Sequence, residues 1–143
     1  MAEFDIACLD TRTLSTKGVK FLIKDPRTGK QWRNAAKEPL YVLLAGRNSS
    51  TFESLQQLAN ENRTAYAARD VEFTAEEIRE ERIAYVAGCT MGWNFDNLDG
   101  KPFPYSEGNA QLLWENKRFN WLMNQAFDFV LNEANFLGDT PDA

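Results

Sequence analysis

Apolar residues follow short β-like runs in the first third of the chain. Residues 19–24 are apolar and β-branched enough to predict a strand. Residues 25–30 predict a tight turn, because proline presets φ at the first corner and glycine accepts a positive φ. Residues 31–33 would then be the return strand of a hairpin. The apolar run at 40–45 predicts a third strand, although it also fits a short buried helix.

From residue 50 onward, apolar positions recur every three or four residues, which predicts helices. Ser50 begins a capping-box pattern for the first of them. The polar stretch at 60–63 would either fray or stand out in solvent. Thr74 begins a second capping-box pattern, and we expect its helix to end near Thr90, where glycines follow.

The last third predicts a loop and two further helices. Residues 93–105 contain two prolines and are too irregular for a paired strand, so they predict a loop. Ser106 is a suitable N-cap for a helix over 107–114, which would break near Asn116. The final helix is expected over 119–136. Its spacing predicts a buried side of Leu122, Ala126, Phe127, Val130, Ala134 and Leu137.

These elements predict an α+β fold, in which a small N-terminal antiparallel β-hairpin or sheet packs on a C-terminal helical bundle. We expect a single domain over residues 1–138, β-rich over 1–46 and helical over 50–137. The polar end at 139–143 is expected to be a flexible tail. A chain of 143 residues is the size of one domain with a modest core.

The chain contains no histidine, which removes the usual catalytic triads and the commonest transition-metal ligand. Carboxylate and lysine chemistry remain open. The acidic turn at 96–100 fails as an EF-hand loop, because Phe95 and Ser106 stand where acids are required. Cys8 and Cys89 fit no metal or redox spacing, and a disulfide between them stays open. We expect a non-enzymatic protein with no cofactor and no metal.

Charge is distributed unevenly along the chain. Residues 1–40 carry eight Lys or Arg and five acids, a net +3, so the rest carries −8. This is too weak a basic excess to predict nucleic-acid binding, and a protein with two differently charged faces is expected. We expect no membrane span, because apolar runs fall short of the roughly 20 residues required. The acidic start of the chain does not resemble a signal peptide.

Aromatic residues supply the candidate binding surface. Trp93, Phe95, Phe103 and Tyr105 bracket the predicted loop, where exposed rings could anchor a partner. The alternative is that these rings fold back and cap the helices. Trp121 shares a helix face with polar residues and is a further candidate for partner binding, although burial through the break near Asn116 is equally compatible with its position.

Three segments carry a resemblance to a known family: Cys89-Thr90-Met91-Gly92-Trp93, then Asp99-Gly100-Lys101-Pro102-Phe103-Pro104-Tyr105-Ser106, and finally Ala134-Asn135-Phe136-Leu137. In this order the chain resembles the tail-assembly chaperones of long-tailed, siphovirus-type bacteriophages. The resemblance implies a protein of the host cell cytoplasm that is absent from the finished virion. It also implies binding to the phage tape-measure protein, delivery to the polymerising major tail protein, and possible homo-oligomerisation.

Other functions remain open from the sequence. A structural tail or head-completion subunit retained in the virion would also fit, as would a binding module unrelated to phage. An enzyme that works without histidine is a further alternative. A holdase needs no catalytic residues, only apolar surface on a charged body, and this agrees with the composition.

Overall fold

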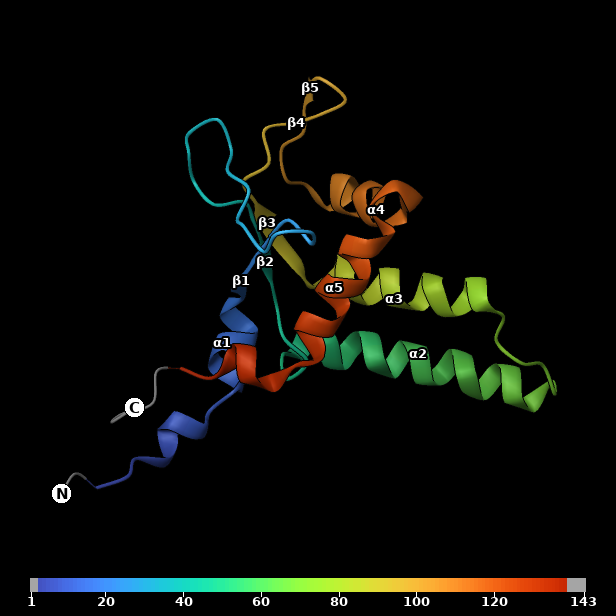
Figure 1. Cartoon of the computed structure of the whole chain (residues 1–143). Helices are drawn as coiled ribbons and strands as arrows, with labels where there is room; N and C mark the ends of the chain where they lie inside the picture. Colours follow the sequence, from blue (N-terminus) through green and yellow to red (C-terminus); the bar gives the residue numbers. More distant parts are fainter. Residues whose placement is uncertain (1–2, 139–143) are drawn as a thin grey trace.

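A computed structural model describes residues 3–138, and its α+β architecture confirms the predicted fold class (Figure 1). The tail predicted at 139–143 lies outside the described residues. The helices, with their shorter 3-10 turns, are η1 (Ile6–Leu9), α1 (Arg12–Lys17), α2 (Ser50–Ala68), α3 (Ala75–Cys89), α4 (Glu107–Glu115), η2 (Lys117–Phe119), α5 (Asn120–Leu131) and η3 (Glu133–Phe136).

A three-stranded antiparallel sheet lies at the centre, in the order β1 (Val19–Leu22), β2 (Tyr41–Leu44), β3 (Thr90–Trp93). The run at 40–45 is therefore a strand rather than a helix, and it is the central one. Helix α3 ends at Cys89, near Thr90 as predicted, but no strand was predicted at residues 90–93, and β3 corrects that part of the prediction. Its pairing is long-range, since Trp93 lies opposite Val42 of β2.

The predicted hairpin forms its turn but not its return strand. Asp25 closes the turn, because its backbone N–H donates to the Lys30 carbonyl at 2.8 Å. Beyond one bridge between Lys24 and Gln31, β1 pairs with β2 instead. The Leu40 N–H donates to the Trp32 carbonyl at 2.8 Å, so residues 31–33 lie against the chain that returns to β2. We call residues 24–38, which project beyond the sheet in Figure 1, the basic loop.

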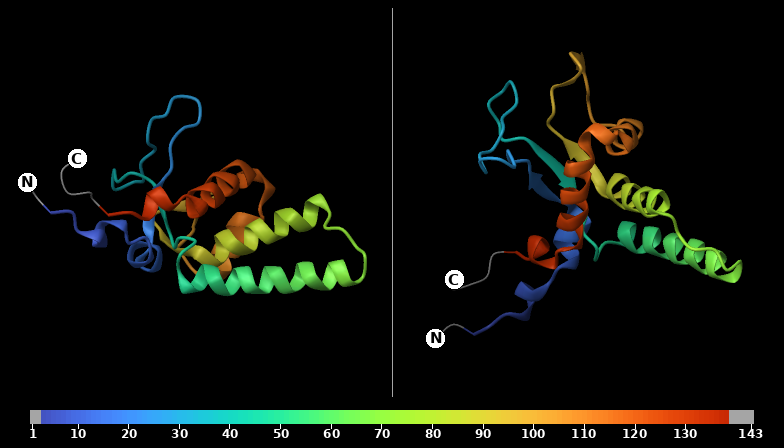
Figure 2. Two further views of the ribbon diagram at one scale, coloured as in Figure 1. Left: turned by 90° about the horizontal axis from the view of Figure 1, so that it is seen from below. Right: turned by 45° about the vertical axis from the view of Figure 1, so that its right-hand side comes forward.

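Helices α2 and α3 form an antiparallel helical hairpin that extends away from the sheet (Figures 1 and 2). The cap of α2 is Ser49, one residue before the predicted Ser50, because the Ser49 hydroxyl accepts the Phe52 N–H. The capping box at Thr74 is confirmed. The polar stretch at 60–63 stays helical and stands out in solvent, where Arg63 pairs with a carboxylate of α3 at 2.9 Å.

The C-terminal helices complete the core. Ser106 caps α4 as predicted, and the chain breaks at Asn116 before α5 begins. Helix α5 packs on the sheet, where the rings of Phe129 and Phe21 lie 5.1 Å apart. The helix ends at Leu131 rather than at 136, because Asn132 takes an extended conformation and starts a 3-10 turn.

That early end changes the helical phase of the last residues. Ala126 and Val130 are fully buried, as predicted. Beyond the break, Phe136 is buried instead of the expected Leu137, which is 38% exposed, and Ala134 is exposed as well.

The predicted loop at 93–105 contains a small hairpin of β4 (Asn97–Leu98) and β5 (Lys101–Pro102). The sequence therefore wrongly excluded paired strands here. Asp99 and Gly100 make the turn with φ of 51° and 79°, as a two-residue hairpin turn requires. The hairpin folds the chain back over the ends of the helices, which decides where the loop's aromatic rings lie.

Candidate binding groove

Trp93 and Phe103 lie in the core rather than on an exposed surface. Trp93 is 9% exposed and Phe103 is 8% exposed. Their rings stack with centroids 5.2 Å apart, and the Trp93 indole N–H donates to the Phe103 carbonyl at 2.9 Å. Both residues thus follow the alternative in which the rings cap the helices. Their expected role as freely accessible contact residues is corrected accordingly.

Tyr105 is also fixed by contacts inside the protein. It is half-buried, its ring meets Trp93 edge-on at 5.3 Å, and its hydroxyl donates to the Thr90 carbonyl at 2.9 Å. Phe95 packs on the other side of Trp93 at 5.5 Å and is only half-buried. Phe95 therefore offers part of its ring to solvent, above a floor of buried residues that includes Phe103.

A groove of about 390 Å³ opens above this floor. Its walls come from the basic loop, the 95–98 segment, the end of η2 and the start of α5. The lining includes three of the five predicted residues and seven further apolar ones. We call it the aromatic groove and define it by Ile23, Trp32, Arg33, Asn34, Leu40, Phe95, Asp96, Asn97, Leu98, Phe103, Leu113, Phe119, Trp121 and Leu122.

Two partly exposed tryptophans from different segments lie side by side in the lining of the aromatic groove. Trp32 is 40% exposed and Trp121 is 38% exposed, and their rings meet edge-on with centroids 6.4 Å apart. Trp121 was predicted, whereas Trp32 was not. The available signal for Trp32 was a large aromatic side chain set between polar neighbours in a segment rich in turns. Trp114, by contrast, is fully buried, because the break at Asn116 separates its surroundings from those of Trp121.

Hydrogen bonds fix the two loop walls against each other. The Asn94 side chain accepts the Tyr41 N–H at 2.9 Å and donates to the Pro39 carbonyl at 2.8 Å. A carboxylate oxygen of Asp96 accepts the Ala35 N–H at 2.8 Å. These contacts link the basic loop and the residues that follow it, 39–41, to the 94–96 segment, so defined hydrogen bonds hold the two walls in place. A preformed site loses less conformational entropy on binding.

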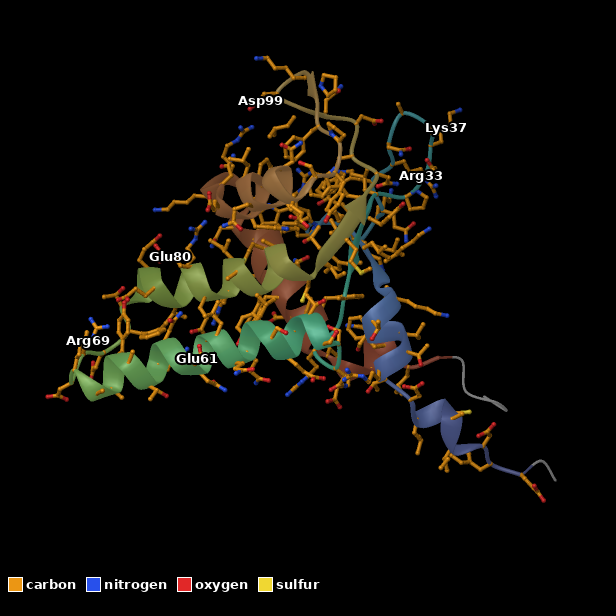
Figure 3. The ribbon with its side chains drawn as sticks, turned by 180° about the vertical axis from the view of Figure 1, so that it is seen from behind. Arg33, Lys37, Glu61, Arg69, Glu80 and Asp99 are labelled. Carbon is orange, nitrogen blue, oxygen red and sulfur yellow. The ribbon has the colours of Figure 1, made fainter. Side chains whose placement is uncertain are left out.

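Positive charge surrounds one side of the groove. The basic loop carries five Lys or Arg against Asp25 and Glu38. Figure 3 places Arg33, Lys37 and Asp99 at the same end of the molecule. Asp99 is engaged by Arg118, with two contacts of 2.9 Å, and this hydrogen bonding lowers the pKa of the Asp99 carboxyl.

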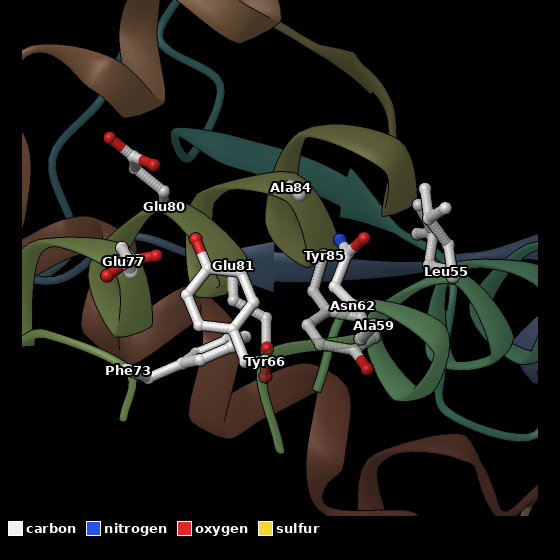
Figure 4. A pocket seen from close by; sticks show the side chains of 11 residues that line it. Leu55, Ala59, Asn62, Tyr66, Phe73, Glu77, Glu80, Glu81, Ala84 and Tyr85 are labelled. Carbon is white, nitrogen blue, oxygen red and sulfur yellow. The ribbon is translucent and has the colours of Figure 1, made fainter. Parts of the chain in front are cut away.

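A second pocket of about 320 Å³ lies between α2 and α3 (Figure 4). Tyr66 and Phe73 meet edge-on there at 4.5 Å. Three carboxylates, from Glu77, Glu80 and Glu81, line the same pocket. This second pocket is therefore acidic, whereas the aromatic groove lies beside the basic loop.

The described cysteine of the core, Cys89, lines neither the aromatic groove nor the α2–α3 pocket. Burial raises the pKa of the Cys89 thiol to about 12, so this thiol is protonated at neutral pH. Among the described residues, no three His, Cys, Asp or Glu side chains gather where a metal ion could be held. What the aromatic groove offers is apolar contact area with a few polar groups at its edge.

Comparisons with known proteins give no relative for the chain. No protein-family model, no curated protein and no solved structure matches it. Within residues 3–138, no helix combines the length and the apolar character that crossing a membrane would need. The aromatic groove and the sequence segments described above are therefore the features that bear on function.

Proposed function

We propose that the protein is a tail-assembly chaperone of a long-tailed bacteriophage, which binds the tape-measure protein in the aromatic groove. It would act in the host cell cytoplasm, without catalysis or cofactor, and bring its client to the polymerising major tail protein. The observation that carries this proposal is the pair of exposed tryptophans, Trp32 and Trp121, which touch edge-on in a groove with an apolar floor.

The groove suits an apolar segment of a helical client. An amphipathic helix lays side chains at spacings of three and four residues into such a groove, and aromatic rings make the strongest anchors. Trp32 and Trp121 touch edge-on, so both can contact one client side chain that packs on the pair. Phe95 and Phe119 extend the same apolar lining. A bound client would thereby lose exposed apolar surface that would otherwise drive its aggregation.

The test is an affinity pull-down of the tagged chain from phage-infected cells, read by mass spectrometry, together with the same measurement on purified virions. We expect tape-measure and major tail proteins in the eluate and no copy of this chain in virions. Recovery of the chain from virions would instead indicate a structural subunit. An eluate without tail proteins would refute the chaperone proposal.

Matched variants test the groove itself. Trp32→Ala and Trp121→Ala should each weaken binding of the purified tape-measure protein about 30-fold, since a central anchor is worth about 2 kcal/mol. Leu112→Ala is the control, because Leu112 is 62% exposed on α4 and does not line the groove. Equal affinity for all variants, with unchanged circular dichroism, would place the client elsewhere on the protein.

A further inference from the structure

The α2–α3 pocket runs along the seam of the helical hairpin, on the part of the fold that extends away from the sheet (Figures 1 and 2). Its lining comes from α2, α3 and the turn that joins them. Leu58 in this lining is 55% exposed, and Tyr66 and Phe73 are half-buried. Apolar side chains left in reach of solvent along two helices suit a third helix that lies in the groove between them.

A cation of the chain itself already occupies one part of this pocket. The Arg63 guanidinium lies over the Phe73 ring, 4.7 Å from its centroid, and donates to the Glu81 carboxylate at 2.9 Å. A ring and a carboxylate thus hold this guanidinium together. These are the two kinds of group by which proteins recognise the Lys and Arg side chains of a partner.

Two further carboxylates of the pocket are not paired with a cation. Figure 4 shows Glu77 and Glu80 near Tyr66 and Phe73. One oxygen of Glu77 accepts the Thr74 backbone N–H at 3.1 Å, which fixes the side chain without neutralising it. Glu80 is exposed, and neither glutamate takes part in the ion pairs formed within residues 3–138. Negative charge therefore remains available beside the exposed apolar surface.

The charge of the surrounding structure has the same sign as that of the pocket. Residues 50–89, which make up the helical hairpin, carry eight Asp or Glu against four Lys or Arg, a net −4. The whole chain carries a net −5. A cationic partner is therefore attracted at long range as well as at the pocket, whereas an acidic one is repelled.

Other hollows on the surface lack this combination of acid and aromatic groups. The lining of the aromatic groove is neutral, because Arg33 balances Asp96. A pocket between α3 and α5 is basic, with Arg79 and Arg82 and no acid in its lining. A hollow on the outer face of α2 has two glutamates but no aromatic ring. Of these four sites, the α2–α3 pocket is the one that matches a partner both apolar and basic.

We propose that the α2–α3 pocket binds a basic amphipathic helix of a protein partner. Apolar side chains of that helix pack on Leu58, Tyr66 and Phe73, and its Lys or Arg side chains pair with Glu77 and Glu80. This is an interaction surface separate from the aromatic groove. It does not depend on the tape-measure protein being the client in that groove.

The test is fluorescence anisotropy of a labelled helical peptide of leucine and lysine, with the leucines on one face, titrated with the full chain. We expect saturable binding tighter than about 1 mM, which weakens as salt screens the charges. Glu80→Lys should weaken binding about tenfold or more, because a like charge replaces an opposite one. An unaltered chain that does not bind the peptide would overturn the proposal.

Glu61→Lys is the matched control for charge. Glu61 also lies on the helical hairpin, but it lines the hollow on the outer face of α2 rather than the α2–α3 pocket. The change in net charge is the same, yet salt screens distant charges, so binding should stay within about twofold. Circular dichroism checks that both variants stay folded. Equal weakening by the two variants would mean general attraction to an acidic protein and would refute the pocket.

A second pair of variants tests the apolar contact. Leu58→Ala should weaken peptide binding about fivefold, since it removes apolar area that the helix would cover. Leu112→Ala should leave binding unchanged, because Leu112 is 62% exposed on α4 and lies outside the pocket. A peptide with glutamine in place of leucine should bind more weakly than the original. Equal binding of the two peptides would overturn the proposed helix contact. Failure here leaves the chaperone proposal to its own test.

Discussion

Replacing Trp93 with alanine should destabilise the fold rather than merely weaken partner binding. The side chain is 9% exposed and packs against the rings of Phe95, Phe103 and Tyr105 at 5.2–5.5 Å. A tryptophan buries about 200 Å² of surface, and at about 25 cal/mol per Å² this contributes about 5 kcal/mol. Truncation of a buried tryptophan usually costs about 3–5 kcal/mol.

The indole N–H adds a smaller amount through its 2.9 Å bond to the Phe103 carbonyl. Such a bond contributes about 1 kcal/mol net, part of which water would restore. We therefore expect Trp93→Ala to lower the free energy of unfolding by about 4 kcal/mol, a large share of the roughly 5–15 kcal/mol of a typical domain.

Urea unfolding followed by far-ultraviolet circular dichroism measures this loss without relying on tryptophan fluorescence. With a slope of about 2 kcal/mol per molar urea, the midpoint should fall by about 2 M. Trp32→Ala is the matched control. Its side chain is 40% exposed at a loop surface, so truncation leaves no closed cavity and should cost about 1–2 kcal/mol. Equal losses in the two variants, or a loss below 1 kcal/mol for Trp93→Ala, would refute the packing of the loop on its floor.

Three other changes test separate parts of the fold. Thr74→Ala should lower stability by about 1 kcal/mol in thermal unfolding, with Thr74→Ser near the original value, because the hydroxyl closes a capping box. Gly46→Ala should cost about 1–3 kcal/mol in urea, since its Cβ would lie 2.9 Å from the Phe136 ring and crowd the Ser15 hydroxyl. Burial raises the pKa of Cys89 from 9.0 to about 12, so stability should fall as pH rises through that window, and Cys89→Ala should reduce the fall.

Local signals in the sequence predicted those elements that local chemistry determines. Thr74 and Ser106 cap their helices as expected, because a hydroxyl at the N-cap meets its own backbone two or three residues on. Strand β3 could not be predicted in this way. Its residues 90–93 include Gly92 and lack clear alternation, and they become a strand by pairing with β2, about fifty residues earlier. Long-range pairing leaves no local pattern.

In the candidate site, too, the sequence predicted features that depend on local residues and missed those that depend on long-range contacts. The sequence predicted Phe95, Phe103 and Trp121 as partner-binding residues, and all three line the aromatic groove, although Phe103 is buried rather than exposed. It could not tell which rings face inward, because that depends on the β4–β5 turn folding the loop back on Trp93. Trp32 was missed because its neighbours are polar and its partner, Trp121, lies far away in the sequence.

The distribution of the four tryptophans is the strongest argument that the groove has a purpose. Trp93 and Trp114 are buried, and each indole N–H donates to a protein oxygen, at 2.9 Å and 3.0 Å. Trp32 and Trp121 remain about two-fifths exposed although they come from distant segments. One exposed tryptophan would be ordinary, but two that meet edge-on at a groove present a shared apolar surface. The core is complete without them, so their shared exposed surface is where we expect a partner to dock.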